Sequence, residues 1–391
     1  MQPTDFTHDK TGRLLKNPHG YWSYVPAPLP PELPLSWELV GRLSEADRAL
    51  AELRGVAQTL PNPHLLIGPF VRREAVLSSR IEGTQADLSD LLLYEATGRP
   101  DPTLTADTAD VQEVANYVTA LEHGLSRLSD LPLSLRLVRE MHEKLMAGVR
   151  GERLTPGEFR RSQNWIGPAG CTLNNAAYVP PPVAEMQEAL GLLERFWHAR
   201  SELPPLVRIA LAHYQFEAIH PFLDGNGRIG RLLITMLLST EGLLSQPLLY
   251  LSAFFEKNRP EYYRRLLAVS QRGEWNEWLL FFLRGVAEQS SDAVARARRL
   301  QALWQRYRET LQSARTSVLL LRLLDRLFAD PAISVSQAAQ ELGVTPRAAQ
   351  QNIDRLVGEG IVAEATGRQR NRVYVAVEIL RLLEVAKEMD G

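Results

Sequence analysis

A single cysteine, Cys171, occurs in the 391 residues. No internal disulfide can form, so packing must stabilise the fold, and a reducing compartment suits such a chain. The formal net charge is only −2, which argues against a global attraction to nucleic acid or to an acidic membrane. The most apolar stretch, Leu232 to Leu238, is far too short to cross a bilayer, and we expect no membrane association. The opening residues 1–5 lack a charged region followed by an apolar run, so we expect a cytoplasmic protein without a signal peptide.

The remaining composition is that of an ordinary globular protein, with 45% hydrophobic and 23% charged residues. The length suits two or three domains, and no internal repeat is present. Apolar residues recur at helical spacing through most of the chain, which predicts a mainly α fold. The predicted helices cover residues 36–60, 68–97, 107–125, 133–147, 183–198, 205–219, 228–238 and 275–310.

Two segments are predicted to be non-helical. The first 35 residues are rich in proline and aromatic residues, and we expect them to run as extended chain over another surface. Residues 151–182 lack helical spacing and end in Tyr178-Val179-Pro180-Pro181-Pro182. This passage is the best candidate for a short β-hairpin or flap.

Residues 313–391 have the pattern of a winged helix-turn-helix domain. An apolar helix is predicted first, and a second helix ends at Gly343. Thr345 then caps a third helix that has Pro346 at its first position. Two strands around a polar turn follow, at residues 361–364 and 372–375.

Residues 220–231 read His-Pro-Phe-Leu-Asp-Gly-Asn-Gly-Arg-Ile-Gly-Arg. A Gly-Asn-Gly turn before a helix exposes main-chain N–H groups at the positive helix end, which makes an anion site. Arg228 and Arg231, three residues apart, can reach neighbouring phosphates. Asp224 offers the hard oxygen that Mg²⁺ prefers, and His220 can take a proton near neutral pH. The combination predicts a phosphate-transfer site.

This segment strongly resembles the signature of the Fic family, His-Pro-Phe-x-Asp/Glu-Gly-Asn-Gly-Arg-x-Gly-Arg, at every fixed position. The resemblance covers residues from about 65 to 285 and includes residues 211–219, Phe159-Arg160, Asn164-Trp165-Ile166-Gly167, Asn258-Arg259 and Tyr262-Tyr263. It implies a helical core with a short β-hairpin flap. It also implies that AMP is transferred from ATP to a Ser, Thr or Tyr hydroxyl of a target protein and of the protein itself, with release of pyrophosphate.

The resemblance implies a role for each residue of the motif. His220 would deprotonate the target hydroxyl, and Asp224 would hold Mg²⁺ on the α- and β-phosphates. The residues that would bind ATP and its phosphates are Gly225, Asn226, Gly227, Arg228, Ile229, Gly230 and Arg231. Phosphorylating relatives have alanine and lysine at the places of Gly225 and Gly227, which favours AMP transfer here. Some relatives transfer UMP or phosphocholine, so the nucleotide base stays open.

A second pattern matches the family's inhibitory sequence, Ser/Thr-x-x-x-Glu-Gly/Asn, at residues 78–83. Ser78 and Glu82 are four residues apart and would share one helix face. In the family this glutamate pairs with the second arginine of the motif, here Arg231, and ATP then settles in an unproductive pose. The resemblance therefore implies autoinhibition by Glu82, and Pro61-Asn62-Pro63-His64-Leu65-Leu66 upstream is also as in relatives.

Other residues carry weaker implications. Asn258, Tyr262 and Tyr263 resemble residues that line the adenine pocket, although packing of the tyrosines between helices is a nearly equal interpretation. Tyr178-Val179 falls in the stretch that family members use as a flap, which docks an extended target segment by strand addition. His142 and His213 lie in apolar helices without a partner motif, and we expect packing or surface roles for both.

The winged-helix region leaves its partner open. Side chains on its third helix and wing are placed to face a DNA groove: Arg347, Gln350, Gln351, Arg355, Arg368, Arg370 and Arg372. Over residues 313–391, however, acidic and basic residues are equal in number. DNA binding is therefore not favoured over protein interaction or a homodimer.

These patterns predict four regions: an N-terminal extension and inhibitory helical region at 1–105, a Fic catalytic core at 106–290, a connecting helix at 291–312 and the winged-helix domain at 313–391. The predicted function is that of a protein adenylyltransferase using ATP and Mg²⁺. One alternative is an ATP-sensing transcription regulator, although the intact His220, Asp224 and Arg231 argue against a core without catalysis. The other is removal of AMP at the same site, with Glu82 positioning a water molecule.

Overall fold

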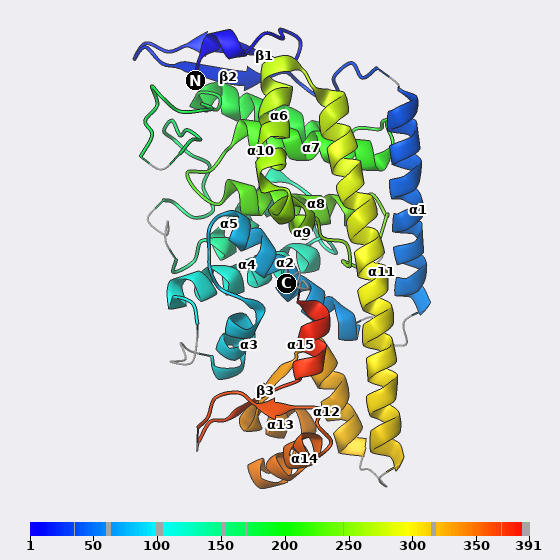
Figure 1. The fold of residues 1–391 in the computed structure, drawn as a ribbon. Helices are drawn as coiled ribbons and strands as arrows, with labels where there is room; N and C mark the ends of the chain where they lie inside the picture. The colour runs from blue at the N-terminus through cyan, green and yellow to red at the C-terminus, as the bar shows by residue number, and fades with distance from the viewer. Residues whose placement is uncertain are drawn as a thin grey trace, which may run out of the picture. The chain divides into compact units, whose positions relative to one another are not determined.

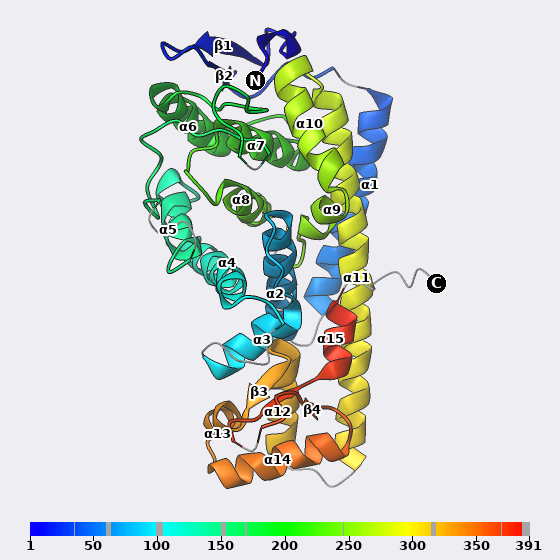
Figure 2. The ribbon, with the colours of Figure 1, turned by 60° about the vertical axis from the view of Figure 1, so that its left-hand side comes forward.

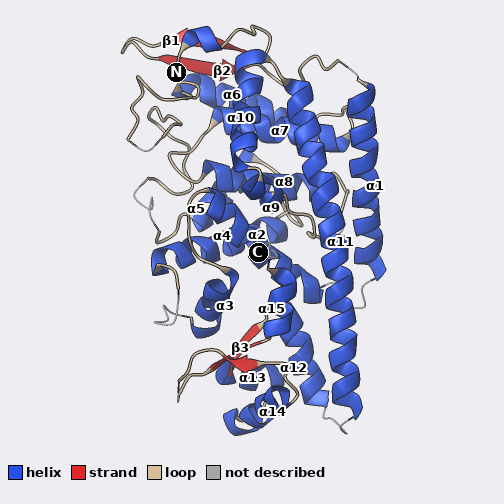
Figure 3. Cartoon of the chain, in the orientation of Figure 1, coloured by secondary structure: helices blue, strands red, loops and turns tan. Residues whose placement is uncertain are grey.

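The computed structural model describes residues 1–34, 36–59, 64–98, 105–149, 154–168, 170–244, 246–313, 318–368 and 370–384. In these residues the chain is mainly helical, with small antiparallel sheets, as the sequence predicts (Figure 3). It forms two compact units. The first consists of Met1–Leu50, Thr119–Leu244 and Leu251–Gln289, and the second of Ala51–Val118, Ser245–Tyr250 and Ser290–Gly391. No helix within the described residues is long and apolar enough to cross a membrane.

The first unit begins with a β-hairpin. After a 3₁₀ turn at Pro3–Asp5, β1 (Gly12–Lys16) and β2 (Trp22–Pro26) pair antiparallel along their full length. The hairpin lies against α6 (Val183–His198) and α7 (Pro205–Ile219) in both views (Figures 1 and 2). The prediction of simple extended chain was therefore incomplete. The missed signal is the Asn-Pro-His-Gly turn at residues 17–20, which ends in a glycine with φ 89°.

Helices α7 and α8 (Asn226–Thr240) form the centre of the first unit, and most of their residues are buried. They approach closely at Gly230, where an added Cβ would lie 2.1 Å from Oε1 of Glu217. The unit also contains all of α5 (Leu135–Leu145), α9 (Ser252–Lys257) and α10 (Arg259–Arg272), together with the second part of α4 (Thr108–Arg127) and the first part of α11 (Trp275–Ser313). This packing positions the loop that joins α7 to α8.

The second unit contains the segment for which one helix over residues 68–97 was predicted. That prediction was wrong, because α2 (His64–Ile81) and α3 (Leu88–Thr97) are separate helices. Gly83 has φ 106°, a conformation that favours glycine, and Asp87 starts α3 with a capping box. Apolar spacing continues through the turn, so periodicity alone did not reveal it. The break predicted at Pro61 and Pro63 lies outside the described residues.

Three long helices continue the chain: α1 (Trp37–Thr59), α4 (Thr108–Arg127) and α11 (Trp275–Ser313). Each contributes residues to both compact units. The single helix predicted from residue 275 to about 310 is confirmed by α11.

The C-terminal part of the second unit is a winged helix-turn-helix, as predicted. It has α12 (Val318–Ala329), α13 (Val335–Leu342), α14 (Pro346–Gly358) and a sheet in the order β3 (Ala332–Ser334), β5 (Val373–Val375), β4 (Ala363–Glu364). The Thr345 hydroxyl accepts the Ala348 N–H at the start of α14, which confirms this cap. A further short helix, α15 (Val377–Leu383), was not predicted.

Candidate active site

The histidine of the motif lies at the C-terminal end of α7. His220 has φ 49° and ψ 62°, in the left-handed region, and its N–H donates to the Phe216 carbonyl at 3.0 Å. Pro221 follows, and a residue before proline is disfavoured in the right-handed helical region, so α7 ends here. The His220 Nδ1 lies 3.3 Å from the Glu217 carbonyl. Because a carbonyl only accepts, this contact is a hydrogen bond in the tautomer that carries the proton on Nδ1, and in that tautomer Nε2 is the atom that can act as a base.

The loop between α7 and α8 is held from within by Asn226, which is 2% exposed. Its Oδ1 accepts the Phe222 N–H at 2.8 Å, and its Nδ2 donates to the Phe222 carbonyl at 2.8 Å. Phe222 itself is fully buried, as expected of a core anchor. The Asn226 side chain therefore shapes the loop, while its main-chain N–H belongs to the first turn of α8.

The start of α8 can bind an anion, because first-turn N–H groups have no acceptor within the helix and lie at its positive end. Gly225 precedes the helix with φ 76°. The Asp224 side chain is 47% exposed, and its Oδ1 lies 4.0 Å from Nη2 of Arg228. In the described part of the chain no group of three or more His, Cys, Asp or Glu could hold a metal. Asp224 therefore fits Mg²⁺ only as one ligand beside phosphates and water.

The two motif arginines are buried in the first turns of α8. Arg228 is 3% exposed and Arg231 is 2% exposed. Ile229 is fully buried, and Gly230 faces Glu217 of α7. The positions of Ile229 and Gly230 serve helix packing, and their contact with a nucleotide stays a prediction.

His142 of α5 contacts the same loop. Its ring stacks on Phe222 with centroids 3.7 Å apart, and it is 2% exposed, which confirms the expected packing role. Its Nδ1 accepts the Gly157 N–H at 2.9 Å, so Nε2 carries the proton and donates to the Asp224 carbonyl at 3.1 Å. Burial lowers the pKa of His142 to about 4, so the ring is neutral at physiological pH. Sequence reasoning missed this contact with the loop.

Two side chains from the passage 151–182 also hold the loop. Nε of Arg160 and Nδ2 of Asn164 both donate to the His220 carbonyl, at 3.0 and 3.1 Å. Asn164 Nδ2 donates to the Phe222 carbonyl as well, at 2.7 Å. Both residues belong to the stretches that carry the resemblance, but the sequence assigned neither of them a role.

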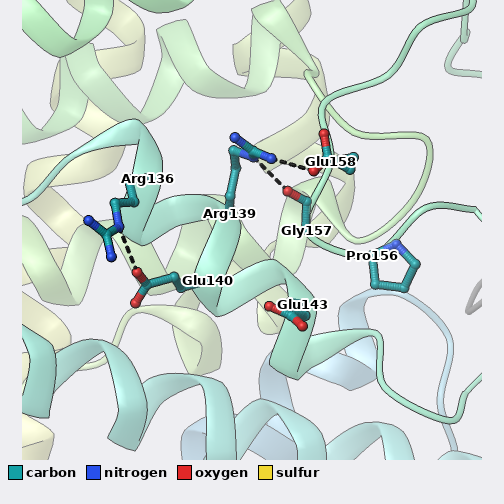
Figure 4. Close-up of a pocket in the computed structure, with 7 residues that line it drawn as sticks. All are labelled: Arg136, Arg139, Glu140, Glu143, Pro156, Gly157 and Glu158. Carbon is teal, nitrogen blue, oxygen red and sulfur yellow. Dashed lines mark hydrogen bonds and ion pairs between the residues drawn. The ribbon is translucent and has the colours of Figure 1, made fainter.

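A cavity of about 320 Å³ is lined by Gly157 and by residues of α5 (Figure 4). Five of its seven lining residues are charged, namely Arg136, Arg139, Glu140, Glu143 and Glu158, and the other two are Pro156 and Gly157. Figure 4 shows Arg136 bonded to Glu140, and Arg139 bonded to Glu158 and to the Gly157 carbonyl. A hydrogen bond from Arg127 is the main reason that the pKa of Glu140 falls to about 2. Both arginines of the lining are thus paired with other groups of the same lining.

The residues predicted to line an adenine pocket lie at the start of α10. Tyr262 is 1% exposed, and its hydroxyl donates to Nε2 of His213 at 2.8 Å. Nδ1 of His213 in turn donates to the Gly230 carbonyl at 3.0 Å. Burial lowers the pKa of His213 to about 3, which confirms its expected packing role. Asn258 is half-buried and donates to the Phe254 carbonyl, and the adenine contact stays a prediction.

The predicted flap is held by one antiparallel bridge, in which Ile166 and Tyr178 exchange hydrogen bonds of 2.8 and 3.0 Å. Tyr178 and Val179 are 6% and 0% exposed. The Val179 carbonyl accepts the Tyr24 N–H of β2 at 2.9 Å, so the N-terminal hairpin occupies this edge. Trp165 and Ile166 are 42% and 38% exposed. Docking of a target on the flap stays a prediction.

The residues of the predicted brake lie at the end of α2 in the second unit. Ser78 is fully buried within the helix. Glu82 is exposed and follows the last helical residue, Ile81, in a turn where its N–H donates to the Ser79 carbonyl at 3.0 Å. Its pairing with Arg231 stays a prediction.

The fold and the site define a mainly helical protein with an anion-binding loop and a C-terminal helix-turn-helix domain. Residues 132–238 match the Fic/DOC family, residues 40–126 match the Fic/DOC family N-terminal region, and residues 320–375 match an HTH DNA binding domain. The chain therefore contains a region that matches the Fic/DOC family, preceded by a match to the family's N-terminal region and followed by a match to an HTH domain.

The chain is 31% identical over 161 residues to protein adenylyltransferase Fic of Drosophila grimshawi and 28% identical over 158 residues to that of Drosophila erecta. These matches cover 40% of this chain but only 29% and 28% of the two relatives. The relationship to Fic adenylyltransferases is thus distant and partial. A crystal structure of a Fic family protein from Desulfovibrio desulfuricans G20 has a similar fold, with a TM-score of 0.56 at 19% identity over 89% of this chain and 98% of that one.

Proposed function

We propose that this protein transfers AMP from ATP to a hydroxyl group of a target protein and of itself. The observation that carries the proposal is the loop from His220 to Asn226, which joins a base, a carboxylate and an anion-binding helix start. Buried hydrogen bonds hold its main chain. Similarity to Fic adenylyltransferases supports the same class of reaction.

In the proposed step the target hydroxyl oxygen attacks the α-phosphorus of ATP. The bond between the α-phosphorus and the oxygen that bridges the α- and β-phosphates breaks, and pyrophosphate leaves. His220 takes the hydroxyl proton at Nε2. Negative charge grows on the departing phosphates, so Arg228, Arg231 and the first-turn N–H groups of α8 act mainly in the transition state.

Asp224 is the residue that would hold Mg²⁺, and the ion, when bound, neutralises charge on the phosphates. Gly225 and Gly227 leave the loop without the side chains of the phosphorylating variant, which favours AMP transfer. We place the adenine beside Asn258 and Tyr262. We place the target segment on the flap edge at Trp165 and Ile166, because the edge at Val179 already carries Tyr24.

We further propose that Glu82, supported by Ser78, is the brake of this reaction. A carboxylate paired with Arg231 would prevent that guanidinium from holding the γ-phosphate. ATP would then bind in a pose from which the α-phosphorus cannot be attacked. The region assigned as residues 1–105 would thus regulate the core assigned as residues 106–290.

Incubation with ATP labelled at the α-phosphate tests the proposal. We expect label on the protein and release of pyrophosphate, more strongly from Glu82→Gly than from the wild type, and far less of both from His220→Ala. Nucleotide bound without label on any protein, in the wild type and in Glu82→Gly, would contradict the proposal and favour an ATP sensor. Loss of label from a modified target on later incubation would instead favour removal of AMP.

A second function, regulation of transcription through the winged helix, is favoured by the match of residues 320–375 to an HTH DNA binding domain. Exposed residues of α14 and of the wing include Arg347, Gln351, Arg355, Arg370 and Arg372. These side chains would bind DNA mainly through its phosphates, and the affinity for DNA must therefore fall as the salt concentration rises.

A further inference from the structure

A buried arginine outside the motif bonds the main chain beside the catalytic histidine. Arg160 is 1% exposed. Its Nε donates to the His220 carbonyl at 3.0 Å, its Nη1 to the Ser162 carbonyl at 3.2 Å and its Nη2 to the Pro181 carbonyl at 2.5 Å. Its own main-chain N–H donates to the Pro221 carbonyl at 2.9 Å. One residue thus joins the motif to main-chain atoms on both sides of the Ile166–Tyr178 bridge.

The charge of Arg160 is not used in an ion pair. In the part of the chain that the structure describes, the hydrogen bonds of its guanidinium all go to carbonyl oxygens, and no carboxylate pairs with it. Burial lowers the pKa of Arg160 to about 10, which still leaves it charged at neutral pH. A buried charge without an opposite charge is costly, and carbonyl dipoles only partly offset the cost. Its placement is therefore better explained by what it holds than by its contribution to stability.

What Arg160 holds is a residue in an unfavourable conformation. A left-handed conformation costs a residue other than glycine about 1 to 2 kcal/mol, and it persists only where neighbours impose it. The His220 carbonyl receives two donors, Nε of Arg160 and Nδ2 of Asn164. Two donors on one carbonyl orient the peptide plane after His220, and this plane restricts the backbone at the Cα that carries the imidazole.

We propose that Arg160 is a positioning residue for the transfer reaction, holding the His220 main chain so that the imidazole can reach the target hydroxyl. This inference rests on the proposed function, because it takes His220 as the base. Arg160 acts through His220 and touches neither ATP nor the target. Its loss should therefore slow transfer and leave nucleotide binding unchanged.

His142 provides a comparison in which binding and not rate should change, since it bonds the loop at Asp224, where the phosphates would lie. Replacing His142 should weaken nucleotide binding. Arg161 provides a matched control, because it follows Arg160 directly and its side chain is 88% exposed. Arg161→Gln should change neither the rate of transfer nor nucleotide binding.

The experiment compares Arg160→Lys, Arg160→Gln, His142→Leu and Arg161→Gln in the full chain, each in the Glu82→Gly background. Three quantities are measured: kcat for AMP transfer, the Kd of an ATP analogue with a non-cleavable α–β bond in the presence of Mg²⁺, and the unfolding temperature. We expect both Arg160 variants to lower kcat about 10²-fold, the loss that a misplacement of about 1 Å produces. Their Kd should stay within about twofold, whereas His142→Leu should raise it, because only that variant frees the phosphate end of the loop. If Arg160→Gln does not fold, Arg160→Lys and Asn164→Ala carry the test.

Non-additivity distinguishes positioning from a general structural role. In the His220→Ala background, Arg160→Lys should cause no further loss of residual transfer. A further loss there, a rise in Kd that matches the fall in kcat, or an unchanged kcat would each overturn the proposal.

A spectroscopic readout separates this inference from the proposed function. The ring Cε1–H signal of His220, assigned by its absence in His220→Ala, should shift in Arg160→Lys and not in Arg161→Gln. If the wild type transfers no AMP but this signal shifts, Arg160 still positions the His220 ring, and it is the proposed function that fails. If the signal does not shift, the positioning role fails whatever the enzyme transfers.

Discussion

The loop between α7 and α8 and the outer surface of the winged helix use polar side chains in opposite ways. Around the loop, Asn226, Arg160, Asn164 and His142 are buried and bond main-chain atoms. On α14 and the wing, the polar residues are largely exposed, with Arg347, Gln351, Arg355 and Arg372 among them. The loop is thus preorganised for chemistry, because its geometry does not wait for a ligand. The winged helix offers charge that a partner must organise on binding.

The cost of the two arrangements differs as well. Each buried donor of the loop would lose a hydrogen bond if its partner moved, which penalises any other loop conformation by about 1 to 3 kcal/mol per group. Exposed arginines gain little from a fixed geometry, since water already solvates them. We therefore expect changes at the loop to act on rate, and changes at the winged helix to act on weak association.

The largest effect is expected for His220→Ala. Loss of a general base should lower AMP transfer by about 10² to 10⁴-fold, and the Kd of a non-cleavable ATP analogue should remain within about twofold, because the α8 start holds the phosphates. Rate and Kd are measured on the same preparations, with the exposed His19→Ala as control. AMP incorporation equal to that of the wild type would remove His220 from the chemistry.

The next effect is expected for Glu82→Gly. If the carboxylate competes with the γ-phosphate for Arg231, each 1.4 kcal/mol or so of that pair suppresses the active pose about tenfold, so its removal should raise transfer about tenfold or more. Arg231→Ala should lose activity, and the double variant should regain none, because the released group is absent. Equal transfer by wild type and Glu82→Gly at saturating ATP would leave Glu82 without an inhibitory role.

A smaller effect is expected on the stability of the fold at acid pH, through the buried His213. The pKa of His213 is about 3 in the folded chain against 6.5 as its ordinary value. Between these values the unfolded chain binds a proton that the folded chain does not, so the free energy of unfolding falls as pH falls from 6.5 toward 3. At pH 5 the loss from His213 is about 2 kcal/mol.

Urea unfolding at pH 7 and pH 5 measures this loss. The difference in the free energy of unfolding between pH 7 and pH 5 should be about 2 kcal/mol smaller in His213→Gln than in the wild type. It should be unchanged in His19→Gln, where the replaced side chain is exposed. An undiminished difference in His213→Gln would show that other groups govern acid stability.

The smallest effect is expected at the winged helix. DNA binding should be weak and should fall steeply with salt, with Kd of about 10⁻⁴ to 10⁻⁶ M at physiological salt. The slope of log K against the logarithm of the salt concentration should become less steep by about one in Arg347→Ala and in Arg372→Ala. Nanomolar, sequence-specific binding at physiological salt would reverse the contrast between the two regions and favour the regulator.

The sequence by itself determined the features that depend on neighbouring residues. The run 220–231 predicts a phosphate-transfer site from the sequence alone, because the residues concerned are neighbours in one turn and in the start of one helix. Thr345 and Pro346 mark the start of α14, since capping uses groups three residues apart. Apolar spacing likewise predicted α7 and α11, but it extended one helix through the turn at Gly83, where the φ of 106° and the capping box at Asp87 mark the break.

Only the tertiary structure decided which distant residues hold that motif in place. The bonds of Arg160, Asn164 and His142 to the loop span 60, 56 and 82 residues. The bond from Tyr24 to Val179 spans a still longer stretch of the chain. Local periodicity carries no information about such pairs. They form because burial removes water from the loop carbonyls, which then need donors from whichever side chains the packing of the helices brings within reach.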